Sequence, residues 1–253
     1  MTSIIERGRA TAAVPAPPPA PAPGRPSGRR AAHRSSNGQK AVMAISGAVL
    51  VLFLVGHMLG NLKIFFGAES FNAYAEWLRT VGEPALPGRT ILTLTEIALV
   101  AAVLLHMASA VALARRAAKA RPVKYAARRR PQARGYVART MRYGGVIIVL
   151  FVIWHLLDLT FGVVNPEGFT ATPYDRVVEG FAPSRWPVTL FYVVALVMVG
   201  LHLRHGLWSA FQTLGLARGR TRHLLSVSAA ALSAVLVLGF LSVPFAVLIG
   251  VLK

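Results

Sequence analysis

The sequence contains no cysteine. It therefore cannot form disulfides, thiolate metal sites or cysteine-ligated iron–sulfur clusters, and it cannot attach a haem covalently. Acidic residues are also scarce, with 9 Asp and Glu against 28 Lys and Arg in 253 residues, and the formal net charge is +19. A nucleic-acid-binding domain this basic is rich in charge throughout, whereas here only 15% of residues are charged and 55% are hydrophobic. The combination indicates a membrane protein with basic loops, and nucleic acid is not an expected partner.

Five apolar segments have about the length of 20 residues that crosses a bilayer as a helix. They span residues 41–66, 90–114, 143–164, 187–211 and 224–252. We therefore expect an all-α membrane protein whose transmembrane domain, residues 41–253, contains five helices.

Residues 1–40 differ in composition from the rest. The stretch AVPAPPPAPAPGRP at 13–26 favours polyproline II and cannot build a core, and seven Lys and Arg lie within residues 1–40. No apolar run precedes the prolines, as a secretory signal would require. We interpret this segment as a disordered basic tail in the cytoplasm.

Basic residues gather in alternate loops. The tail carries seven, the loop between the second and third segments eleven, and the loop between the fourth and fifth three, whereas the other two loops carry six acids. By the positive-inside rule, the N-terminus lies in the cytoplasm and the C-terminus outside. Orientation and contact with membrane lipid are the simplest roles for most of these arginines.

Five of the seven histidines lie inside apolar segments, where ionisable groups are costly and usually functional. At about 1.5 Å per residue, His57 and His155 fall in the outer half of the membrane. His106 and His202 fall in the inner half, and depth does not separate His202 from His205. Two histidines from two helices at one level suit bis-histidine ligation of a b-type haem. We expect four helices to form a di-haem bundle, with one haem on His57 and His155 and the other on His106 and His202.

Four stretches, in chain order, resemble the single-subunit, two-haem cytochrome b anchor of succinate dehydrogenases and fumarate reductases. They are FLVGHMLGNLKIFFGAESFNAYAEWL, LLHMASAVALARRA, MRYGGVIIVLFVIWHLLDLTFG and GLHLRHGLWSAFQTLG. The resemblance covers roughly residues 41–250. In its fourth motif, F-H-x-x-N-G-L-W-S, the ligand matches His202, and His205 stands where Asn is common. Val42 replaces a His of some relatives, and Gly200 replaces a Glu of some fumarate reductases.

The resemblance implies a function in a respiratory complex of the bacterial cytoplasmic membrane. A flavoprotein subunit would oxidise succinate, an iron–sulfur subunit would pass on the electrons, and this chain would relay them through two haem b groups to a quinone, with menaquinone expected. The chain would be part of an enzyme without oxidising succinate itself. The direction of the reaction, the quinone site and any higher oligomer of the complex stay open.

Other polar residues are candidates for contact with haem or quinone. Arg142 matches a basic position of the family and is the first candidate partner of a haem propionate; the others are Arg204, His205 and Lys63. The candidates for the quinone or its protons are Glu96, Asp158, Asn61 and Trp154. For the two acids, a structural pair with Lys63 or a hydrogen bond to Ser or Thr is an equally open interpretation.

Two other functions compete with this one. The first is the cytochrome b anchor of a hydrogenase or formate dehydrogenase, which the I-W-H and H-x-x-x-G-L-W-S motifs disfavour. The second is a haem-free transporter or proton channel that uses histidines and acids. A test for b-type haem separates the second from the others.

Overall fold

The computed structural model describes residues 35–120 and 134–253, with side chains described outside 134–140. Within these ranges, five helices are long and apolar enough to cross a membrane, and no strand occurs. They are α2 (Ser36–Leu62), α4 (Thr90–Lys119), α5 (Arg134–His155), α7 (Trp186–Thr213) and α8 (Thr221–Leu248). The prediction of an all-α membrane protein with five spans is confirmed.

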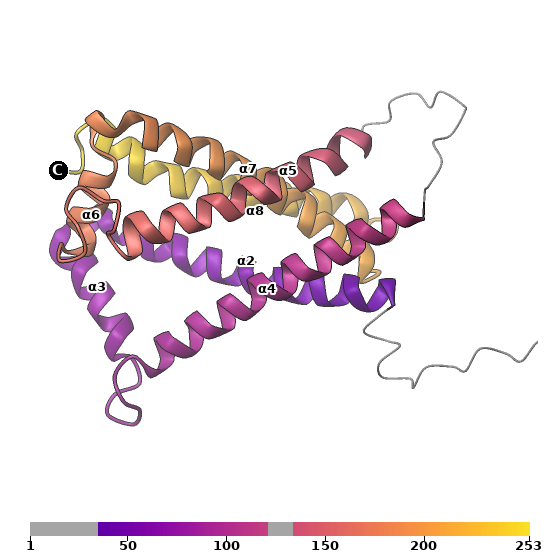
Figure 1. Ribbon diagram of the computed structural model, residues 1–253, viewed down its shortest axis with the longest axis horizontal. Helices are drawn as coiled ribbons and strands as arrows, with labels where there is room; N and C mark the ends of the chain where they lie inside the picture. Colours follow the sequence, from indigo (N-terminus) through magenta and orange to yellow (C-terminus); the bar gives the residue numbers. More distant parts are fainter. Residues whose placement is uncertain (1–34, 121–133) are drawn as a thin grey trace, which may run out of the picture.

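The long helices run alongside one another, and two short helices gather at one end of them (Figure 1). These are α3 (Ala68–Thr80) and α6 (Pro173–Gly180), and the C-terminus lies at the same end. Helix α4 packs along α2, α5 packs along α7, and α8 packs against both α7 and α2. The end with α3 and α6 is the one that we expect outside the cell from the loop charges.

Helix α2 begins earlier than the apolar pattern predicts. The Ser35 side chain accepts a hydrogen bond of 3.0 Å from the Gly38 amide and so caps the helix. Residues 36–40, which we assigned to the tail, are therefore the first turn of the span. The rest of the expected tail, residues 1–34, lies outside the described residues.

Helix α5 ends at an unusual turn. It stops at His155 and continues as a single π-helical turn, Leu156–Thr160, and such turns are frequent at functional sites. The apolar segment that we expected to reach residue 164 therefore leaves helical geometry four residues earlier. Asp158 lies within this turn and is completely buried.

Glycines set the closest approaches between the long helices. A Cβ on Gly200 of α7 would lie 2.5 Å from Cγ2 of Val237 on α8, and a Cβ on Gly239 would collide with Met58 of α2. Elsewhere the long helices expose apolar side chains, such as Leu104 on α4 and Leu238 on α8, which suits contact with lipid.

Candidate functional site

The structure brings His57 of α2 and His155 of α5 together. Their ring centroids lie 5.8 Å apart, with the ring planes at 85°. Phe53 stacks on His57, Phe240 of α8 contacts the same ring, and Tyr192 of α7 contacts His155 at 6.1 Å. This outer pair is therefore enclosed by aromatic rings, and α8 supplies one of them.

The structure also brings His106 of α4 and His202 of α7 together, with ring centroids 6.2 Å apart and ring planes at 58°. Nδ1 of His106 lies 3.1 Å from the Met43 carbonyl oxygen on α2 and 3.4 Å from the Ser46 hydroxyl. A carbonyl oxygen only accepts, so Nδ1–H of His106 donates to Met43. This bond leaves Nε2 of His106 unprotonated, as is typical of a metal-ligating histidine.

The two pairs lie at different levels of the bundle. Along α2, the contacts to the inner pair come from Met43 and Ser46, and His57 of the outer pair follows Ser46 by eleven residues. At 1.5 Å per residue, the levels are roughly 16 Å apart. The ring that His106 contacts belongs to His202, the histidine that we selected over His205.

Both pairs fit a haem held by two histidines. A metal–imidazole bond is about 2 Å long, so rings on opposite sides of one metal ion have centres roughly 6 Å apart, and both pairs have that separation. Nδ1 of His155 and of His202 is buried without a hydrogen-bond partner. Beside the half-buried Gly206 of α7, an added Cβ would meet nothing within 4 Å, which leaves room near His202.

A bare metal ion fits the described residues less well. Residues 35–120 and 134–253 contain no group of three or more His, Asp or Glu that could hold one. The two-histidine arrangement therefore favours a group that brings its own equatorial ligands, as a haem does.

The predicted propionate partners occupy varied surroundings. Arg142 and Arg204 are exposed, and His205 is half-buried. Nζ of Lys63 lies over the ring of Tyr74, 5.7 Å from its centroid. Their role toward a haem stays a prediction.

The candidates for the quinone or its protons differ in whether their side chains already have an ion-pair or hydrogen-bond partner. Glu96 is exposed and forms an ion pair of 3.2 Å with Arg89, so the suggested pair with Lys63 is wrong for this acid. Asn61 is half-buried. Trp154 contacts Phe191, and its Nε1 is buried without a hydrogen-bond partner.

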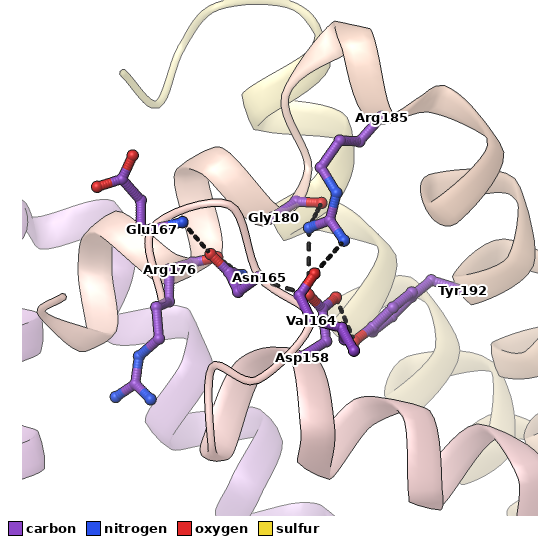
Figure 2. A network of polar contacts seen from close by, with 8 residues as sticks. All are labelled: Asp158, Val164, Asn165, Glu167, Arg176, Gly180, Arg185 and Tyr192. Atoms are coloured by element: carbon purple, nitrogen blue, oxygen red, sulfur yellow. Dashed lines mark hydrogen bonds and ion pairs between the residues drawn. The ribbon is translucent and has the colours of Figure 1, made fainter. Parts of the chain in front are cut away.

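Asp158 lies at the centre of a polar network (Figure 2), is completely buried and follows His155 by three residues. Its Oδ1 is 3.1 Å from Nη1 of Arg185 and accepts from Nδ2 of Asn165 at 3.3 Å, and its Oδ2 accepts from the Tyr192 hydroxyl at 3.2 Å. We call Asp158, Arg185, Tyr192 and Asn165 the Asp158 cluster. The suggested pair with Lys63 is wrong here too, because the partner is Arg185.

The cluster ties the π-helical turn to the chain that follows it. Arg185 also donates to the carbonyls of Gly180 and Val164, at 3.1 and 3.3 Å. Asn165 donates to the carbonyl of Arg176, and Nη1 of Arg176 donates to the Thr160 carbonyl at 2.7 Å. Burial, with a smaller effect of Arg79, lowers the pKa of Arg176.

The sequence pattern did not reveal the cluster as a unit. Arg185 and Asn165 lie in loops where polar residues are ordinary, and Tyr192 is one aromatic residue in an apolar span. The available signal was the acid at Asp158, whose burial requires a cationic or hydrogen-bonding partner.

Comparison with protein-family models matches residues 118–241 to the succinate dehydrogenase/fumarate reductase transmembrane subunit. No curated protein and no solved structure matches the chain. The matched range holds α5 and α7, and with them His155, His202 and the whole Asp158 cluster. The match spans just under half of the chain, and it is consistent with the five helices that could cross a membrane. Over this range the chain is similar to the succinate dehydrogenase/fumarate reductase transmembrane subunits.

Proposed function

We propose that this chain is a di-haem cytochrome b, in which His57 and His155 hold one haem b and His106 and His202 hold the other. The similarity of residues 118–241 to the succinate dehydrogenase/fumarate reductase transmembrane subunit supports a place as the membrane subunit of such a complex. The observation that carries the proposal is the presence of two histidine pairs, with ring separations of 5.8 and 6.2 Å, at two levels of one bundle.

Haem iron with two histidine ligands has no open position for a substrate, so the chemistry that it supplies when bound is electron transfer. The protein's own part is to orient the ligands and exclude water. The Met43 carbonyl fixes the tautomer of His106. Phe53 and Phe240 cover His57, and Tyr192 covers His155.

The distribution of charge supports an orientation and a docking side. The end with Arg218, Arg220 and Arg222 would face the cytoplasm, as would the basic tail of residues 1–40. A flavoprotein and an iron–sulfur subunit would dock there, and the C-terminus would lie outside a bacterial cytoplasmic membrane. Residues 41–253 would be the cytochrome b domain, extended by the helical turn at 36–40.

A quinone, with menaquinone our expectation, would accept the electrons. Quinone carbonyls require hydrogen-bond donors, and among the predicted residues Trp154 has a buried Nε1–H without a partner. Asn61 is the second donor candidate. The carboxylates of Glu96 and Asp158 already have cationic partners, so their part in proton supply is the weaker component of the proposal.

The test uses the full chain, co-expressed with its partner subunits and purified in detergent. A pyridine haemochrome assay should give two b-type haems per chain, and succinate should reduce them in the complex with flavin and iron–sulfur subunits. An intact complex that contains no haem b would contradict the proposal and would favour a haem-free role. Haem that responds to hydrogen or formate but not to succinate would contradict the assignment of the electron donor.

A further inference from the structure

The Asp158 cluster borders only the outer histidine pair. Asp158 lies three residues beyond His155 in the π-helical turn, and its side chain is 0% exposed. Tyr192 joins the two, because its ring lies 6.1 Å from the His155 ring and its hydroxyl donates to Asp158. Tyr192 thus contacts both the buried carboxylate of Asp158 and the ring of His155, a proposed haem ligand.

Among the side chains that the structure describes, no buried charged group lies beside the inner pair. In the part of the chain that the structure describes, the buried charged side chains are Asp158 and Arg176, both at the outer end. The inner pair contacts a hydroxyl and a backbone carbonyl, from Ser46 and Met43. The two sites therefore differ in their charge surroundings although both have two histidines.

The charges in the cluster are fixed in place. The Arg185 side chain is 15% exposed and is held by two backbone carbonyls in addition to Asp158. Water screens such charges weakly, so each acts on its neighbours more strongly than a surface charge does. A well-packed apolar pair is often at least as stable as a buried ion pair, so stability does not by itself explain these two charges.

We propose that the Asp158 cluster positions His155 and sets the reduction potential of the outer haem, an inference that rests on the proposed function. Tyr192 and the π-helical turn hold the ring of His155, so these are positioning residues. The carboxylate of Asp158 favours the oxidised, more positive iron, and the guanidinium of Arg185 favours the reduced iron. The two charges act with opposite signs on the same site.

Redox titration of the purified complex, followed in the haem absorption bands, tests this inference. Asp158→Asn should raise the midpoint potential of the outer haem, and Arg185→Gln should lower it. Each change should alter the ratio of reduced to oxidised haem at a given potential by about tenfold, which for one electron is about 59 mV. The potential of the inner haem should stay constant. Arg185→Lys, which keeps the positive charge, should leave the potential of the outer haem close to that of the wild type.

Glu76→Gln is the matched control, because Glu76 also forms an ion pair with an arginine, Arg79, but is 66% exposed. It should move neither potential. Tyr192→Phe keeps the ring against His155 and removes only the hydrogen bond to Asp158, so it should lower the outer potential by less than Arg185→Gln does. If Asp158→Asn loses haem, the potentials of the Tyr192→Phe and Arg185→Gln variants still test the inference.

Shifts of the same sign in the Asp158 and Arg185 variants, or equal shifts of both haems, would indicate general loosening and overturn the inference. Unchanged potentials would overturn it as well. A wild-type complex without haem contradicts the proposed function, whereas two haems with an unmoved outer potential contradict only this inference.

Discussion

The contact between α7 and α8 at Gly200 offers a sharp test of the packing that positions His202. A Cβ on this residue would lie 2.5 Å from Cγ2 of Val237 and 3.9 Å from the Ser233 carbonyl. A side chain at position 200 therefore has to push α8 away or move Val237. Because His202 follows two residues later on the same helix, such a shift also moves a proposed ligand of the inner haem.

The expected magnitude combines two opposing effects of Gly200→Ala. Overpacking a core contact costs about 1–3 kcal/mol, whereas alanine in a helix is about 1 kcal/mol more favourable than glycine. The net destabilisation should thus be up to about 2 kcal/mol. Adding Val237→Ala removes the clash but keeps the gain in helix propensity, so the two substitutions should couple by about 1–2 kcal/mol.

Equilibrium unfolding in mixed detergent micelles, followed by circular dichroism, measures these free energies of unfolding. Gly56→Ala is the control, because Gly56 is exposed on α2 and a Cβ there would meet nothing within 4 Å. It should be neutral or stabilising. The packing argument fails if Gly200→Ala is as benign as Gly56→Ala, or if the effects at positions 200 and 237 simply add.

Three further outcomes are expected. A Cβ at Gly47 would lie 3.3 Å from Cε1 of His106, so Gly47→Leu should displace that ring and lower the haem content from two to one per chain. Arg185→Met should lower the free energy of unfolding by about 3–5 kcal/mol because it leaves Asp158 buried without its cation, and a second change, Asp158→Leu, should recover most of that loss. Trp154→Phe removes the free Nε1–H, so it should raise the KM for quinone in steady-state assays at constant haem content. An unchanged haem content in Gly47→Leu would contradict the first expectation. A further loss of stability on adding Asp158→Leu would contradict the second, and an unchanged KM for quinone in Trp154→Phe would contradict the third.

The membrane spans and the depth of the histidines follow from the sequence for a simple physical reason. Hydropathy marks a span, and the constant rise of a helix converts a residue's place in the span into a depth. Depth groups His57 with His155 and His106 with either His202 or His205, and in the structure His57 contacts His155 and His106 contacts His202. The basic loops indicate the cytoplasmic end of each helix, from which depth is counted.

The partners of the buried acid do not follow from depth. Which groups meet Asp158 depends on the rotation of each helix about its axis and on the path of the loop through Asn165 to Arg185. A local departure from α-helical geometry at the π-helical turn changes that rotation just after His155. For the same reason, the contact of Phe240 with His57 could not be predicted from an apolar pattern that gives α8 no distinctive face.

The most direct test of the central claim is the haem content of single-histidine variants in the purified complex. His57→Ala and His155→Ala should each leave one haem per chain, with identical reduced-minus-oxidised spectra. His106→Ala and His202→Ala should each leave the other haem, and the exposed His223→Ala should keep both. Loss of the same haem from the His57 and His106 variants would contradict the account.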